Sequence, residues 1–180
     1  MRKIILNLAV SLDGYIEGPN GEYDWCFTDQ DYGMAEFYNT IDVVFMGRKT
    51  YEMVSADPEA FVDKKIYVFS DTLTAVEHPH AEIVTKAVFK QRVEEIRHEE
   101  GGNIWLFGGA DLVSSFIAEK LINILLLSVH PIILGSGKRL FDGVADKTEL
   151  ILLEQQAFSS GLMQLKYALK PVFDYSMIEL

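Results

Sequence analysis

The sequence predicts a three-layer α/β domain whose sheet is mainly parallel and closes with an antiparallel hairpin. Short runs of branched and apolar residues, typical of buried strands, alternate with segments of helical spacing. Strands that alternate with helices favour parallel pairing, because each connecting helix packs back on the sheet. The last two apolar runs, "TELILLEQQAF" and "LMQLKYAL", are joined by only Ser-Ser-Gly, which favours a hairpin at one edge.

The predicted elements follow one another without an internal repeat or a linker, so a single domain over residues 1–180 is expected. Strands are predicted at 3–10, 42–47, 64–70, 81–85, 103–107 and 122–134, and the hairpin at 148–158 and 162–169. Helices are predicted over about 30–40, 48–54, 86–102 and 110–120. The segment 11–25 is rich in Gly, Pro, Asn and Asp and is predicted to be a long loop.

Composition excludes several function classes. The formal net charge of -11 argues against a nucleic-acid or anionic-membrane partner, because both need a basic surface. Cys26 is the one cysteine, so no intramolecular disulfide can form, and a reducing cytoplasm is expected. The four histidines lack metal-ligand spacing, so no metal site is expected. A phosphate-bearing ligand would need a local cluster of cations.

One such cluster follows the second predicted strand. Gly47 ends that strand, and Arg48, Lys49 and Thr50 open the next helix. Exposed amides at a helix start attract anions, and an arginine can bind a phosphate with two donors. The same residues also fit an ordinary solvated helix start, and the local sequence does not decide between the two interpretations.

Two further strand ends carry similar signals. Ser70 follows the third strand and can donate to a phosphate or ribose oxygen, although Ser-Asp is also a common turn. Gly108 and Gly109 lie between the fifth strand and a helix, where missing side chains let a pyrophosphate approach the backbone. Close packing of the strand on the helix is the alternative reason for this pair. Because ligands of open α/β sheets bind beyond the carboxyl ends of the strands, the three ends together predict a nucleotide site.

The order of five segments carries a family resemblance over roughly residues 3–170: "LNLAVSLDGYI", "VVFMGRKTYE", "IYVFS", "IWLFGGADLVSSF" and "VHPIILGSGKRLF". It resembles the dihydrofolate reductase-like superfamily. It is most similar to the branch that contains the reductase domain of bacterial riboflavin biosynthesis, the RibD C-terminal domain. The resemblance implies a dihydrofolate reductase-like fold and NADPH as the cofactor.

The resemblance also implies which residues hold NADPH. Arg48, Lys49 and Thr50 match the motif at its phosphates, and Ser70 matches the residue near the adenosine 2′-phosphate. The strand end at 107–109 matches one that carries a cis Gly-Gly bond beside the pyrophosphate and nicotinamide. The full set of implied cofactor-binding residues is Ala9, Gly47, Arg48, Lys49, Thr50, Ser70, Phe107, Gly108, Gly109, Ala110 and Asp111.

Two acidic residues are candidate catalytic groups. Asp13 lies in the segment 11–16, which by resemblance lines the nicotinamide, but "LDG" also serves as a plain turn. Folate reductases carry one acidic residue early in the first helix. By resemblance to them, the same spacing counted back from the "GRKT" motif leads to Asp31, with Asp29 close by. A carboxylate there can orient or protonate a nitrogen heterocycle, or it can simply cap the helix. Both interpretations remain open for each residue.

The sequence departs from both groups of relatives. It has "SADPEAF" at 55–61 in place of an acidic "DDP" stretch, and Asp24-Trp25 in place of Pro-Trp. The resemblance as a whole implies an NADPH-dependent reductase that transfers hydride to a C=N or C=O bond of a pterin, pyrimidine or ribosyl-type substrate. It resembles 5-amino-6-(5-phosphoribosylamino)uracil reductase, with dihydrofolate reductase as an alternative.

Other expectations concern assembly and surface cations. A second hypothesis is an NADP(H)-binding module without turnover, and a third is a homo-oligomer that uses the strand 122–134 and the final hairpin. A homodimer is the expected assembly. Lys138 and Arg139 either meet a substrate phosphate or form a solvated turn.

Overall fold

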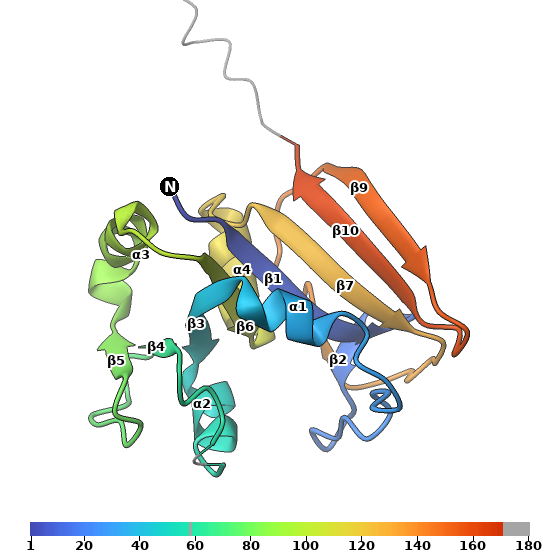
Figure 1. Cartoon of the computed structure of the whole chain (residues 1–180), viewed down its shortest axis with the longest axis horizontal. Helices are drawn as coiled ribbons and strands as arrows, with labels where there is room; N and C mark the ends of the chain where they lie inside the picture. The colour runs from blue at the N-terminus through green and yellow to red at the C-terminus, as the bar shows by residue number, and fades with distance from the viewer. Residues whose placement is uncertain (58, 171–180) are drawn as a thin grey trace, which may run out of the picture.

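The branched and apolar runs of the sequence form one eight-stranded sheet. The computed structural model describes residues 1–57 and 59–170. The strands of the sheet are β1 (Ile4–Ser11), β3 (Ile41–Gly47), β4 (Lys65–Phe69), β5 (Ala81–Val84), β6 (Asn103–Gly108), β7 (Ile124–His130), β9 (Leu150–Ala157) and β10 (Met163–Leu169). Their order is β5-β4-β3-β6-β1-β7-β10-β9 (Figure 1).

The sheet has the predicted mixture of parallel and antiparallel pairs. β1 pairs with β6 and β7 in parallel, β3 pairs with β6 and β4, and β4 pairs with β5. The hairpin β9–β10 is antiparallel and joins the sheet through β7. The predicted parallel sheet with a C-terminal hairpin at its edge is therefore confirmed.

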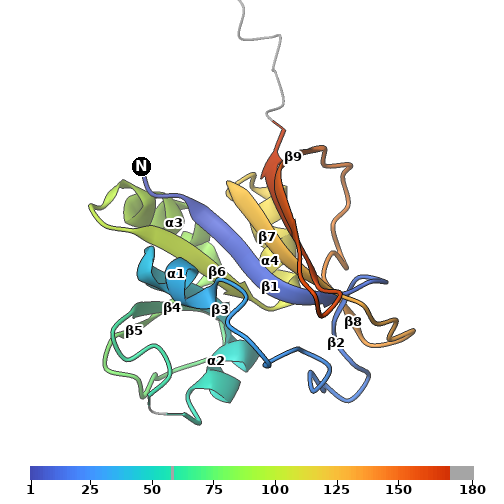
Figure 2. The same ribbon diagram turned by 45° about the vertical axis from the view of Figure 1, so that its right-hand side comes forward.

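Helices lie on both faces of the sheet, as Figure 2 shows from the side. The helices are α1 (Met34–Asn39), α2 (Arg48–Val54), α3 (Phe89–His98) and α4 (Ala110–Ala118), and a short 3-10 turn (Lys86–Val88) precedes α3. Side chains of α3 and α4 pack into one buried cluster, and Phe37 of α1 and Tyr51 of α2 pack into the other. These two clusters form the inner surfaces of the three layers.

Several predicted elements are shorter than expected, including the helix predicted over 86–102, whose α-helical part is Phe89–His98. The helix predicted from about residue 30 begins at Met34, because Tyr32 and Gly33 have left-handed φ angles of 50° and 80°. The strand predicted to reach residue 134 ends at His130, since Pro131 has no amide hydrogen for the sheet.

A small second sheet was not predicted. β2 (Tyr15–Glu17) lies in the expected loop, and it pairs antiparallel with β8 (Lys138–Arg139). The two strands approach closely at Gly137, where φ is 132° and an added Cβ would collide with the carbonyl oxygen of Glu17. Strands of three and two residues are too short to show an alternating pattern in the sequence.

Across residues 1–57 and 59–170, no helix combines the length and the apolar character that a membrane span needs.

Candidate cofactor-binding groove

The strand register brings four chain segments together at the carboxyl edge of the sheet. Gly47 of β3 is the register partner of Phe69 in β4, and Phe69 is the partner of Val84 in β5. On the other side of β3, Met46 is paired with Gly108 of β6. Neighbouring strands lie about 4.8 Å apart, so the four segments leave the sheet within about 15 Å of one another. The predicted convergence of the strand ends near 47, 70 and 108 is confirmed.

A groove of about 1220 Å³ follows this edge. In Figure 1 the edge is the lower one, where α2 and β2 lie. Among the residues implied by resemblance, those that line the groove are Gly47, Arg48, Lys49, Thr50, Ser70, Gly109, Ala110 and Asp111. The volume lies slightly above the usual range for small-molecule and cofactor sites, which suits an extended ligand.

The Gly-Gly pair lies beside the start of α2. The peptide bond between Gly108 and Gly109 is cis, as the resemblance implied. An added Cβ on Gly109 would lie 3.7 Å from Oγ1 of Thr50, so the two chain segments flank the groove closely. No side chain caps the start of α4 at Gly109. The first amides of α4 are therefore available to an anion in the groove.

The groove is locally cationic in a chain of net charge -11. Its cationic residues are Arg48, Lys49, Lys86, Lys90 and Lys138, and its acidic residues are Glu17, Asp71, Asp111 and Glu119. Three of the cations are paired: Arg48 with Glu52 at 2.7 Å, Lys90 with Glu119 at 2.8 Å and Lys138 with Asp111 at 2.9 Å. Lys49 and Lys86 form no ion pair with any residue in the described part of the chain. This is the local cluster that a phosphate-bearing ligand requires.

The hydroxyl group of Ser70 is held at the groove by its own turn. Its Oγ accepts hydrogen bonds from the amides of Thr72 at 3.1 Å and Leu73 at 2.9 Å. A hydroxyl accepts at its lone pairs and donates through its one hydrogen. The Ser70 Oγ also lies 3.4 Å from Oγ1 of Thr72, so the two amide bonds and this hydroxyl contact together fix the position of the Ser70 hydroxyl at the groove.

Three of the implied residues lie outside the groove lining: Ala9, Phe107 and Gly108. Phe107 packs on the sheet face that α1 and α2 cover, with its ring 4.8 Å from Trp105 and 5.3 Å from Phe61. Ala9 lies in β1 opposite Ser128 of β7. Their assignment to NADPH stays a prediction.

Asp13 lies outside the groove lining and is held by its own turn. Its carboxylate accepts hydrogen bonds from the hydroxyl of Ser11 at 2.7 Å and the amides of Leu134 and Gly135 at 3.1 and 2.8 Å. These bonds, led by that from Ser11, lower the pKa of Asp13 to about 2. Asp13 is therefore a carboxylate at neutral pH and has no proton to donate.

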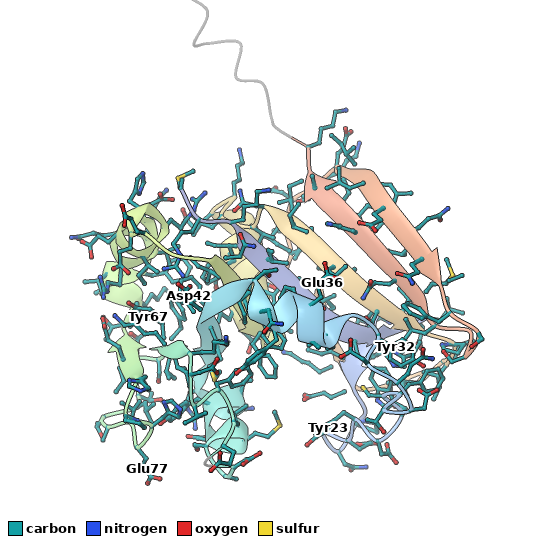
Figure 3. All side chains as sticks on the ribbon, viewed as in Figure 1. Tyr23, Tyr32, Glu36, Asp42, Tyr67 and Glu77 are labelled. Atoms are coloured by element: carbon teal, nitrogen blue, oxygen red, sulfur yellow. The ribbon has the colours of Figure 1, made fainter. Side chains whose placement is uncertain are left out.

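Asp31 also lies outside the groove lining, at the start of α1. It accepts the amide hydrogens of Gly33 at 3.1 Å and Ala35 at 2.9 Å, which is the capping role that the sequence left open. Asp29 accepts the hydroxyl hydrogen of Tyr32 at 2.7 Å. Figure 3 shows Tyr32 beside the turn between β9 and β10, where its hydroxyl also bonds to Ser160. A catalytic role for Asp31 stays a prediction.

His130 anchors the loop before α1. Its ring is buried, its Nε2 accepts the amide hydrogen of Phe27 at 3.1 Å, and its Nδ1 donates to the carbonyl oxygen of Ser128 at 2.9 Å. Burial lowers the pKa of His130. Both ring nitrogens of His130 therefore have hydrogen-bond partners within the fold.

Groove residues at the end of β5 were missed by the sequence analysis. Lys86, Lys90 and Gln91 line the groove but were assigned only to a predicted helix. The rule that ligands bind beyond the carboxyl ends of parallel strands applies to the fourth strand as it does to the others. Applied there, it would have identified Lys86.

The chain matches the RibD C-terminal domain family over residues 2–164. It is 38% identical over 179 residues to the uncharacterized protein YyaP of Bacillus subtilis (strain 168), with 92% of this chain and 94% of that protein covered.

Solved structures share the fold, and two of them illustrate it. A putative riboflavin biosynthesis protein from Shewanella sp. PV-4 is 26% identical with a TM-score of 0.79, covering 95% of this chain and 100% of that one. Dihydrofolate reductase from Enterococcus faecalis is 12% identical with a TM-score of 0.68, covering 94% and 97%. The chain therefore has the dihydrofolate reductase-like fold that its sequence predicts.

Proposed function

The chain belongs to the RibD C-terminal domain family, and on that premise we propose that it is an NADPH-dependent reductase of a heterocyclic substrate. The observation that carries the proposal is the cationic groove at the carboxyl edge of the sheet. It combines a volume of about 1220 Å³ with two unpaired lysines among the described residues and uncapped amides beside two glycines. This donor set fits a dinucleotide with several phosphates.

Different residues of the groove would bind different parts of NADPH. Arg48, Lys49 and Thr50 would hold phosphate oxygens, and Ser70 would meet the adenosine ribose. Gly109 and the first amides of α4 would receive the diphosphate, because no side chain fills that space. When bound, NADPH supplies a hydride to the carbon of a C=N or C=O bond, and the nitrogen or oxygen of that bond takes a proton.

The family and the acidic residues of the chain support a proposed substrate class. We propose a pterin, pyrimidine or ribosyl-type heterocycle, since a solved relative is a putative riboflavin biosynthesis protein. Asp13 cannot be the acid at neutral pH, because its pKa is lowered to about 2. Asp31 would orient the heterocycle if the carboxylate exchanges one of its amide partners for a ring nitrogen, and water would then deliver the proton.

The same acids support a second candidate function. Both carboxylates make structural hydrogen bonds, and neither lines the groove. A module that binds NADP(H) without turnover would have the same features. Turnover with any pterin or pyrimidine separates this candidate from the reductase.

We also propose a homodimer formed through β9. Leu150, Ile151, Leu152 and Leu153 are 40–51% exposed and follow one another on this edge strand. Four consecutive exposed aliphatic side chains on an edge strand favour association with another surface. Cys26 as the sole cysteine suits a reducing cytoplasm as the location.

A titration tests the cofactor. The full chain is titrated with NADPH and with NADH by calorimetry, and the titrations are repeated with Arg48→Ala and with Lys166→Ala. Lys166 lies on β10 and pairs with Glu154, so its variant controls for the loss of one positive charge. We expect the wild-type chain to prefer NADPH. Arg48→Ala should weaken NADPH binding about tenfold, since hydrogen bonds to charged groups contribute about 1.5–3 kcal/mol. Equal weak binding of both nucleotides, unchanged by Arg48→Ala, contradicts the proposal.

A further inference from the structure

A buried side-chain amide in β1 lacks a strong hydrogen-bond partner. Asn7 is 4% exposed, and its Nδ2 lies 3.6 Å from Sδ of Met34 at the start of α1. Its Oδ1 accepts no hydrogen bond from residues 1–57 or 59–170. A thioether sulfur is a weak acceptor, so this amide is poorly satisfied for a buried polar group. Its backbone is nevertheless fixed, because Nε1 of Trp105 donates to the carbonyl oxygen of Asn7 at 2.8 Å.

The position of Asn7 connects it with the proposed reaction. Ala9, two residues further along β1, has its side chain on the same face of the sheet, and by resemblance it lies beside the nicotinamide. The amide of Met34 donates to the carbonyl oxygen of Asp31 at 3.0 Å, so the proposed orienting residue lies one turn away. Met34 is 37% exposed and unbranched, and its side chain can move aside for a ligand. A heterocycle oriented by Asp31 would then replace the sulfur as the partner of Asn7.

The chemistry of a carboxamide favours one kind of ligand edge. The amide of Asn7 presents a donor and an acceptor side by side. This pair matches the adjacent N–H and C=O groups of a pyrimidine or pterin ring, as an asparagine matches the edge of adenine in DNA. A phosphate or carboxylate group offers acceptors and would leave the oxygen of the amide unpaired.

The segments around Asp31 carry no cation for an anionic substituent. Residues 4–47 contain eight aspartates and glutamates but no lysine or arginine, so this part of the chain is uniformly acidic. Residues 50–63 contain no lysine or arginine either. The cations gather instead in the candidate cofactor-binding groove. Because like charges repel, a phosphate or carboxylate group on a ligand beside Asp31 would weaken its binding.

Two cations from other segments are the opposing consideration. Lys166 of β10 lies two strands from Asn7 in the register, and it is paired with Glu154 at 3.2 Å. Arg139 of β8 has its guanidinium carbon 4.9 Å from the centre of the Tyr15 ring. Lys166 is therefore neutralised within the sheet, whereas Arg139 needs a test of its own.

We propose that the substrate is an uncharged heterocycle with an amide-type ring edge and without a phosphate or carboxylate group, and that Asn7 binds that edge. This inference rests on the proposed function and narrows its substrate class, because it excludes 5-phosphoribosyl compounds and dihydrofolate. The acidic residues around Asp31 disfavour an anionic substituent, while the cations of the groove serve the cofactor. Asn7 is thus a specificity-determining residue.

Matched ligands test the charge of the substrate. The full chain is saturated with NADP⁺, so that the groove is filled, and is titrated by calorimetry with two pairs of ligands. The pairs are 7,8-dihydroneopterin with its 3′-phosphate and uridine with its 5′-monophosphate, and the members of each pair differ in one phosphate group. We expect the uncharged member of at least one pair to bind, about tenfold more tightly than its phosphate. Equal or tighter binding of the phosphates overturns the inference, as does a lack of binding by both uncharged members.

Two variants test the role of Asn7. Asn7→Leu replaces a poorly paired amide by an apolar group of similar size, so the melting temperature should change little. The uncharged ligand should bind about tenfold more weakly to it, because its ring edge loses both partners, while NADP⁺ binds as before. Met34→Leu removes the sulfur that contacts the free amide, and the same ligand should bind as tightly or more tightly. Unchanged ligand affinity in Asn7→Leu overturns the role of this residue.

Three charge variants complete the test. Glu36 is exposed on α1 (Figure 3), and Glu36→Lys should reduce the preference for the uncharged ligand about threefold, whereas Glu100→Lys, at the opposite edge of the sheet, should leave it unchanged. Arg139→Ala should alter neither affinity. If Arg139→Ala weakens binding of the phosphate member alone, Arg139 holds a substrate phosphate and the inference is overturned.

The outcomes distinguish this inference from the proposed function. A wild-type chain that prefers NADPH but binds the phosphates as tightly as the uncharged ligands overturns the inference and leaves the reductase proposal standing. A wild-type chain that binds no nicotinamide nucleotide overturns the proposed function and the inference with it.

Discussion

Lys138 and Asp111 form an ion pair across the candidate cofactor-binding groove, with Nζ of Lys138 2.9 Å from Oδ1 of Asp111. Lys138 lies on β8 and Asp111 in the first turn of α4, beside the Gly-Gly pair. The carboxylate raises the pKa of Lys138, so this lysine is charged at neutral pH. An acidic group thus occupies the position where the proposed diphosphate would meet the start of α4.

This pair predicts opposite effects of two substitutions. Asp111→Asn removes the negative charge and frees Lys138, so NADPH should bind about threefold more tightly, whereas Lys138→Ala should weaken binding by a similar factor. The melting temperature should change little in both variants, because the aspartate is 90% exposed and such pairs contribute less than about 1 kcal/mol. Calorimetric titration and thermal unfolding measure the two quantities. Weaker binding to Asp111→Asn would contradict the assignment of this end of the groove to the diphosphate.

Substitution of Gly137 should lower the stability of the fold. Gly137→Ala requires a φ of 132° that residues with a side chain rarely adopt, and its Cβ would collide with the carbonyl oxygen of Glu17. We expect a loss of about 1–3 kcal/mol in the free energy of unfolding, together with weaker NADPH binding. The binding effect is expected because Glu17 and Lys138 line the groove.

Gly135 provides a matched control for this substitution. Its φ is also positive, at 74°, but an added Cβ there would have no atom within 4 Å. Urea unfolding should therefore show a smaller loss for Gly135→Ala. Equal losses in the two variants would mean that the contact with Glu17 is not the cause.

The buried imidazole of His130 predicts a pH effect on the neighbouring loop. Because burial lowers its pKa from the ordinary value of 6.5, the neutral form is favoured in the folded chain. The stabilisation is complete above pH 6.5 and declines as the pH falls below that value, since the unfolded chain then binds more protons. Protonation of Nε2 also removes the acceptor for the amide of Phe27.

The fluorescence of Trp25 provides a direct measure of the protonation of His130. The ring of Trp25 lies 5.3 Å from the ring of His130, so its fluorescence should fall as the imidazole gains a proton, with a midpoint below pH 6.5. His130→Gln should abolish the change. A transition that persists in this variant would assign it to another group.

The exposed edge strand predicts a defined assembly. Leu152→Glu places a charge among the aliphatic side chains of β9 and should shift the proposed dimer to monomer in sedimentation experiments. Gln155→Glu changes the net charge equally on the same strand and should leave the dimer intact. A wild-type chain that sediments as a monomer at all concentrations would refute the dimer.

Much of the architecture was predictable, because the buried strands are short apolar runs between turn residues. The groove was predictable in outline for a related reason: Gly47, Ser70 and Gly109 each follow a parallel strand, and such ends must meet at one edge. The pairing of β2 with β8 was not predictable, since it joins segments about 120 positions apart with too few residues for periodicity. The bonds from Leu134 and Gly135 to Asp13 likewise join distant segments, whereas the capping of α1 by Asp31 was one of the two interpretations that the sequence left open.

The end of β6 and the residue after it face two different surfaces within three consecutive positions, 107–109. Phe107 turns its ring toward Trp105 and Phe61 on one face of the sheet, whereas Gly109 opens onto the groove beside Thr50. Substitutions around Phe61 can therefore reshape one surface without altering the groove at the carboxyl edge of the sheet. The packing that α1 and α2 make on this face can thus change while the proposed nucleotide site keeps its shape.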